Sequence, residues 1–160
     1  NGSVQKTPQV TTSFQPDISS DYIENMSLRI DYYYRVGSAT SVEQLNKIEK
    51  ELVDVFGPIP DKTEKLLLVA SLKIKYKPTP VSQIDIQDSV LKIIIQPFDE
   101  QEQLVFLSRV GIYKHKTLES VRFKEVAGGL LGVFLNVSDY GNVFDLLFNF
   151  VHLFDPIDTA

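Results

Sequence analysis

Positions 21–73 read DYIENMSLRIDYYYRVGSATSVEQLNKIEKELVDVFGPIPDKTEKLLLVASLK, and the helix signals in this segment decide the fold of the first half of the chain. Ser41 followed by Gln44 has the spacing of a capping box, which predicts that a helix begins there. Gly57 and Pro58 predict its end, because glycine favours a left-handed C-cap and proline cannot continue a helix. Between these signals an apolar stripe recurs at helical spacing, at Leu45, Ile48, Leu52 and Val55 or Phe56.

One further helix is predicted on each side of this central one. Before it, Ser19 or Ser20 can cap a helix whose apolar face is formed by Tyr22, Met26, Ile30, Tyr33 and Gly37. After it, Asp61 opens a helix with Thr63, Leu67, Ala70 and Ile74 facing inward. The two prolines at positions 78 and 80 then separate the helical half from the rest of the chain.

The second half of the chain contains an internal repeat at an offset of about 40 residues. Residues 88–96 correspond to residues 128–136, and in both copies a two-residue turn precedes a strand. Each copy reads strand, tight turn, strand, helix, which predicts a four-stranded, mostly antiparallel sheet with two helices. We therefore predict an α+β fold, with an N-terminal three-helix segment followed by a ββαββα half. The predicted division is a linker arm at 1–18 and one domain at 19–160, composed of a helical half (19–77) and a ββαββα half (81–157).

Composition limits the function classes. The chain has 160 residues, a net charge of −5 and no cysteine. The acidic balance argues against a general phosphate-binding surface, and the lack of cysteine fits the reducing cytoplasm that we expect as its location. No apolar run is long enough to cross a membrane, and no signal peptide is recognisable. Because the chain begins at Asn1 rather than at a methionine, we expect a segment of a longer polypeptide.

No pattern in the chain predicts catalysis, a cofactor or a metal site. The glycine-rich stretch 128–132 lacks the lysine and the serine or threonine of a phosphate loop, so we interpret it as a hairpin turn. His115 and His152 lie in different elements without a second ligand at helical spacing, and we interpret His115 as a solvated loop residue. The apolar segment 144–154 is interpreted as a helix buried in the core.

Two surfaces remain as candidates for partner binding. On the central helix, Glu51 and Asp54 stand side by side at i and i+3, where paired carboxylates could accept a partner arginine. The second candidate is the sheet, which could bind a nucleic acid through two aromatic and four basic side chains. These are Phe123, Phe134, Lys114, Lys116, Arg122 and Lys124. The acidic composition favours the first surface, so no direct nucleic-acid contact and no membrane contact are expected, and a nucleic-acid-binding accessory domain is the alternative.

The helical segment also resembles a known family. Three words carry the resemblance: Asp21-Tyr22-Ile23, then the pattern Arg-Ile-x-Tyr-Tyr-x-Arg-Val-x-Ser at 29–38, then Glu-Leu-x-Asp-x-Phe-Gly-Pro-x-Pro at 51–60. They are similar to the C-terminal domain of the bacterial transcription-repair coupling factors. The chain departs from the family pattern at Ser19, where proline is favoured, and at Val55, where arginine is common.

The resemblance implies a function for the parent protein and for this domain. The parent would use ATP and magnesium to translocate on DNA, displace a stalled RNA polymerase and recruit nucleotide excision repair through UvrA. The domain itself would be non-catalytic and without a cofactor. It would dock on a UvrB-like module of the same polypeptide, mask the UvrA-binding surface and so autoinhibit the protein. Glu51 and Asp54 match the family word and would contact arginines of that module.

Overall fold

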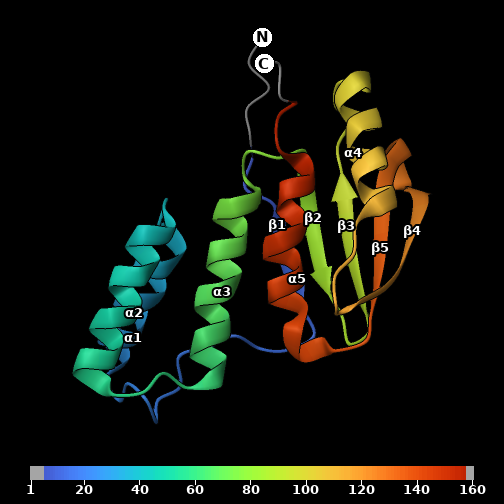
Figure 1. Ribbon diagram of the computed structural model, residues 1–160. Coiled ribbons are helices and arrows are strands. Elements are labelled where there is room, and N and C mark those ends of the chain that lie inside the picture. Colours follow the sequence, from blue (N-terminus) through green and yellow to red (C-terminus); the bar gives the residue numbers. More distant parts are fainter. Residues whose placement is uncertain (1–5, 158–160) are drawn as a thin grey trace. The chain divides into compact units, whose positions relative to one another are not determined.

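The computed structural model describes residues 6–157 and divides them into two compact units (Figure 1). The helical unit is Phe14–Ile74, and the sheet unit consists of residues 6–13 and 75–157. The elements, in chain order, are β1 (Gln9–Thr12), α1 (Met26–Ser38), α2 (Val42–Phe56), α3 (Asp61–Tyr76), β2 (Val81–Ile86), β3 (Val90–Ile95), α4 (Glu100–Ile112), β4 (Leu118–Val126), β5 (Leu130–Val137) and α5 (Val143–Phe150). Short 3-10 turns lie at Ala127–Gly129, Tyr140–Asn142 and Val151–Phe154.

In the helical unit, α2 has the boundaries that the sequence predicts. The Ser41 hydroxyl accepts a hydrogen bond from the Gln44 amide at 3.2 Å, and the Gln44 side chain accepts one from the Thr40 amide at 2.7 Å. Gly57 follows the last helical turn with a φ of 91°, a conformation that side-chain-bearing residues rarely adopt. The predicted stripe is buried at Leu45, Ile48 and Leu52, whereas Val55 is exposed.

Helix α1 corrects the prediction. It begins at Met26 after an Asn25 cap rather than at Ser19 or Ser20, because the preceding residues form a tight turn in which the amides of Tyr22 and Ile23 donate to the Ser19 carbonyl. Tyr32 and Val36 form the buried face of α1. The expected apolar residues Met26 and Ile30 are 65% and 59% exposed. Apolar residues occur on both sides of this helix, so spacing alone could not identify the inward side.

The core of the helical unit is built from all three helices and the chain before α1. Its buried members are Ile18, Ile23, Tyr32, Val36, Leu45, Ile48, Leu52 and Leu67. On α3, the predicted inward positions agree with this core: Thr63 and Leu67 are buried, and Ala70 and Ile74 pack against it.

The sheet unit has the predicted α+β class but five strands instead of four, in the order β1-β2-β3-β5-β4. The four predicted strands pair antiparallel, and β1 adds to β2 in parallel. Strand β1 was not predicted, because its four residues are mostly polar and their pairing partner lies more than 70 positions away. Within the predicted linker arm, residues 1–5 lie outside the described residues. The division into arm and domain stays a prediction.

The repeat places equivalent strands symmetrically about the central β3–β5 pair. The hairpins β2–β3 and β4–β5 are each followed by a helix, and Figure 1 shows α4 and α5 on the same face of the sheet. The second hairpin turns at Gly128 and Gly129, whose φ values of 82° and 74° require glycine.

The face under α4 and α5 forms the core of the sheet unit. Alternate strand residues are buried there, at Ile84, Ile86, Leu91, Ile93, Ile95, Val133 and Leu135. Three helix and turn aromatics join this core: Phe106 stacks on Phe154 with ring centroids 4.4 Å apart and meets Phe150 edge to face. Five residues of α5 are buried, which confirms the predicted core role of this segment.

Candidate interaction surface

Glu51, on α2, forms its contacts with side chains of α1 in the same unit. Its Oε2 accepts a hydrogen bond from the Tyr32 hydroxyl at 2.6 Å and forms an ion pair with Arg35. The Arg35 guanidinium also lies 5.0 Å from the centroid of the Tyr32 ring. Hydrogen bonds from Arg35 and then Tyr32 hold the pKa of Glu51 below its ordinary value, and the same contact with Glu51 raises the pKa of Arg35. Glu51 therefore joins α1 to α2 before any partner is present.

Asp54, one turn further along α2, has a different environment. It is exposed, and no described residue forms a hydrogen bond or an ion pair with it. Val53 and Val55 beside it are 43% and 63% exposed. The sequence predicted Glu51 and Asp54 as one carboxylate pair, and the structure gives them separate roles: Glu51 is engaged internally, and Asp54 is free to accept a bond.

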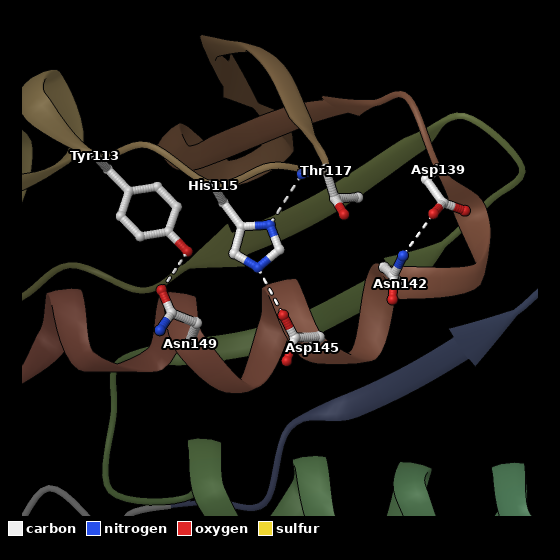
Figure 2. A network of polar contacts seen from close by, with 7 residues as sticks. All are labelled: Tyr113, His115, Thr117, Asp139, Asn142, Asp145 and Asn149. Carbon is white, nitrogen blue, oxygen red and sulfur yellow. Dashed lines mark hydrogen bonds and ion pairs between the residues drawn. The ribbon is translucent and has the colours of Figure 1, made fainter.

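A second group of polar contacts lies in the sheet unit, between the segment after α4 and helix α5 (Figure 2). His115 Nε2 lies 2.8 Å from Asp145 Oδ2, and His115 Nδ1 accepts the Thr117 amide at 3.1 Å. Tyr113 donates its hydroxyl to Asn149 Oδ1 at 2.7 Å. The prediction of a solvated His115 was wrong, because only 10% of its side chain is exposed. Its partner Asp145 lies 30 positions away, so no local pattern could predict the contact.

The hydrogen bonds of His115 and Tyr113 hold the segment after α4 against α5, and they leave no reactive group exposed. Because Nδ1 accepts a backbone N–H, the His115 proton is on Nε2, where Asp145 accepts it. Both ring nitrogens are occupied, which leaves neither free to activate a nucleophile. Burial, followed by the charge of Asp145, raises the pKa of Tyr113 to about 12, so the hydroxyl stays a hydrogen-bond donor at neutral pH. Asp139 accepts bonds from Gly141 and Asn142 and caps the turn before α5.

The nucleic-acid candidates are divided between the two faces of the sheet. Phe134 pairs with Arg122 across β5 and β4, on the face opposite α4 and α5. Phe123, the next residue of β4, pairs with the buried Val133 and therefore lies on the helix-covered face. Lys114 and Lys116 flank His115 outside the strands. The structure does not bring the six predicted residues together on one surface.

Two further features of residues 6–157 bear on function. No group of three or more metal-ligating side chains is found there. The helices in this part of the chain are too short or too polar to cross a membrane.

Comparison with known proteins relates more than half of the chain to one family. The sequence model of the TRCF domain matches residues 13–104. The transcription-repair-coupling factor of Haemophilus influenzae is 34% identical over 68 residues, which are 42% of this chain and 6% of that protein. For the same-named proteins of Escherichia coli and Bacillus subtilis, identity is 38% over 61 residues and 28% over 98 residues. These alignments cover 38% and 59% of this chain, and 5% and 8% of those proteins. The chain thus spans less than a tenth of the length of these relatives.

The fold is similar to one that has been solved. The crystal structure of the C-terminal domain of a transcription-repair coupling factor superposes with a TM-score of 0.71 at 20% identity, covering 93% of this chain and 94% of that one. At this identity the likeness establishes the fold alone. The sequence match covers more than half of the chain, including α1, α2, α3 and both predicted carboxylates, and on this ground the protein belongs to the TRCF domain family.

Proposed function

We propose that this chain is the non-catalytic regulatory domain of a transcription-repair coupling factor. In this proposal it docks on the UvrB-like module of the same polypeptide, masks the surface that binds UvrA and restrains the protein. Binding and hydrolysis of ATP with magnesium, translocation on DNA and contact with RNA polymerase belong to other parts of the parent. The observation that carries the proposal is the family match over residues 13–104.

The contacts of α2 suggest how docking works. Asp54 offers two unoccupied carboxylate oxygens to a partner arginine, which can bind them through two parallel hydrogen bonds. Glu51 contributes in a second way. Both of its bonds end on Oε2, so Oε1 can accept one more donor while Arg35 and Tyr32 keep the carboxylate in place. In this proposal Asp54 is the main contact, and Glu51 is a supporting contact on a braced helix.

A weak interface is sufficient for such a restraint. The docking partner is tethered in the same chain, so its effective concentration is high and no large buried area is needed. Exposed ion pairs of this kind contribute about 0–1 kcal/mol each. Release then requires only a few kcal/mol of competing contacts when the parent binds its target.

The proposal is tested by calorimetric titration of this chain against the separately expressed UvrB-like module of its parent, at two salt concentrations. We expect saturable binding that weakens with salt. Asp54→Lys should weaken binding by about tenfold or more, because it replaces an attraction with a repulsion. Glu49→Lys is the matched control: it makes the same charge change on exposed α2 surface, about 140° around the helix from Asp54.

The contribution of Glu51 to docking has to be tested with a milder substitution than a reversal of charge. Reversal to lysine would bring two cations together at Arg35 and disturb the contact between α1 and α2, so Glu51→Gln is the suitable variant. Equal affinity of wild type and Asp54→Lys would remove Asp54 from the interface. Absence of binding by the wild type even at millimolar concentration, the range that a short flexible tether supplies, would contradict docking between these two parts.

A further inference from the structure

One row of side chains crosses the face of the sheet that α4 and α5 leave uncovered. The strand register aligns Thr11, Asp85, Lys92, Phe134 and Arg122 from β1 to β4. Figure 1 shows both helices of the sheet unit on the other side of these strands. Each member lies within its strand, so the backbone ladder fixes the spacing of the row at about 4.8 Å per strand.

The acidic member of this row, Asp85, lies beside Lys92 in the strand register but forms no ion pair with a described residue. Asp85 accepts hydrogen bonds from neutral donors, the Thr11 hydroxyl and the Gln83 side-chain amide, the latter at 2.9 and 3.0 Å. Lys92 and Arg122 make no hydrogen bond or ion pair with a described residue. Both are directed to Phe134: Lys92 Nζ lies 6.0 Å and Arg122 Cζ 5.4 Å from the ring centroid. Two cations with unused donors therefore lie over one aromatic ring, and a base that stacks on the ring takes the place of one of them.

The position of the ring depends on a glycine. Gly132 lies two residues before Phe134 on the same face of β5, and a Cβ there would be only 3.2 Å from Phe134 Cε2. The ring therefore occupies the space above Gly132, an arrangement in which an aromatic side chain covers a strand glycine. Lys124 pairs with Gly132 from β4 and adds a third, exposed cation beside the ring. We call Lys92, Lys124, Arg122, Phe134 and Gly132 the Phe134 platform.

We propose that the Phe134 platform binds single-stranded nucleic acid, with a base on the Phe134 ring and phosphates on the three cations. A partly exposed ring framed by unpaired donors on an open sheet is the combination that single-strand binding uses, because every base has a π-face and every nucleotide a phosphate. A duplex keeps its bases stacked and cannot use the ring. An acidic polypeptide would use the cations without the ring.

The charge of the platform differs from that of the chain as a whole. The net charge of −5 is the sum over the whole chain, whereas the platform gathers three cations at one place. Lys92 comes from β3, outside the basic cluster of the sequence, and Phe123 lies on the other face. The inference goes beyond the proposed regulatory role. The platform residues all belong to the sheet unit, and Asp54 belongs to the helical unit. A platform variant can therefore lose nucleic-acid binding while docking through Asp54 is kept, and an Asp54 variant can lose docking while nucleic-acid binding is kept.

The test is fluorescence anisotropy of a labelled short oligothymidylate with the whole chain, at low and at physiological ionic strength. We expect saturable binding that weakens as salt rises, and weaker binding of the same oligonucleotide in a duplex. Phe134→Leu should lower affinity about five- to hundredfold, because leucine fills the space above Gly132 but offers no π-face. Phe134→Tyr keeps the ring and should retain binding, which separates loss of stacking from loss of folding.

Charge variants give a second readout. Lys92→Gln combined with Arg122→Gln should weaken binding and reduce the slope of log K against log salt by about 0.7 for each phosphate that the variant no longer neutralises. Lys114→Gln combined with Lys116→Gln is the matched control, with the same change of charge away from the platform, and should bind as the wild type does.

Three results would overturn the proposal. The first is no binding by the wild type at low ionic strength. The second is a control variant that loses as much affinity as the platform variant. The third is unchanged binding in Phe134→Leu together with displacement of the oligonucleotide by polyglutamate, which would identify an acidic polypeptide as the ligand.

Discussion

The central strands of the sheet unit and helix α1 of the helical unit bury their apolar residues to different degrees. In the sheet unit, Ile84, Ile93 and Leu135 are completely buried at the centres of three neighbouring strands. In the helical unit, α1 buries Tyr32 and Val36, yet Met26, Leu28, Ile30, Tyr33 and Tyr34 are all more than a third exposed. The central strands thus bury their apolar face completely, whereas α1 leaves much of its apolar surface exposed. Within the sheet unit, the exposed large apolar residues lie outside these strands: Leu104 and Ile112 on α4, and Phe123 on β4.

This difference indicates which positions tolerate a substitution or a shift of the backbone without unfolding. A strand with one fully buried face cannot move by one residue without exposing every buried side chain on it. A helix with apolar residues on two sides tolerates substitution on the exposed side, and such a surface commonly marks contact with another protein. The family match covers the whole helical unit and continues into the sheet unit through β2 and β3 to the first turn of α4.

The largest predicted effect comes from a matched pair of isoleucines. Ile93 is completely buried in β3, and Ile30 is 59% exposed on α1. Ile93→Ala should lower the free energy of unfolding by about 2–5 kcal/mol, because it removes buried apolar groups and leaves a cavity. Ile30→Ala should change it by less than about 0.5 kcal/mol. Urea denaturation followed by circular dichroism measures both, and similar losses in the two variants would contradict the contrast.

Local signals predicted α2 and the two hairpins well, because their determinants lie close together in sequence. The Ser41 cap, the Gly57 stop and the double glycine at 128–129 each specify a backbone conformation within a few residues. The inward side of α1 could not be predicted in this way, since only packing against α2 selects Tyr32 and Val36. Strand β1 could not be predicted for a similar reason, because its partner β2 is distant in the sequence.

A pair of glycines gives the second contrast. At Gly132 an added Cβ would meet Val126 Cγ1 at 2.8 Å and the Lys124 carbonyl at 3.1 Å, whereas at Gly37, near the end of α1, it would meet nothing within 4 Å. Gly132→Ala should therefore destabilise the chain by about 1–3 kcal/mol through overpacking. Gly37→Ala should stabilise it by about 0.5 kcal/mol, because alanine is the better helix former. Thermal unfolding measures both changes, and a stabilising Gly132→Ala would mean that β4 and β5 do not approach as closely as described.

The candidate sites were only partly predictable. Glu51 and Asp54 were singled out by spacing and by the family word, but their separate roles depend on Arg35 and Tyr32, which come from another helix. The pairing of His115 with Asp145, like the approach of Lys92 to Phe134, joins elements far apart in sequence. Sequence spacing identifies residues on one helix or strand, and side chains that meet across elements require the fold.

The last predictions concern the dependence of stability on pH, where one group in each unit acts in the opposite direction. The folded pKa of Glu51 lies below its ordinary value of 4.5, so its contribution to stability is present above that pH and is lost as pH falls through the folded pKa. The folded pKa of Tyr113 is raised from 10.0 to about 12, so its contribution is complete below pH 10 and is lost as pH rises toward 12. The Glu51 side chain is 42% exposed, which limits its effect to that of a surface ion pair, about 0–1 kcal/mol.

Two variants isolate these effects. Glu51→Gln cannot ionise, so its free energy of unfolding should fall less than that of the wild type when pH is lowered below about 4.5, with little difference above pH 10. Tyr113→Phe should reduce the loss between pH 10 and 12, of which Tyr76 retains a share, and leave the acid side unchanged. Urea denaturation across the pH range measures both slopes. If Glu51→Gln showed the full acid-side loss of the wild type, the carboxylate between Arg35 and Tyr32 would not stabilise the helical unit. Asp54 and Glu51 would then be equally available to a docking partner.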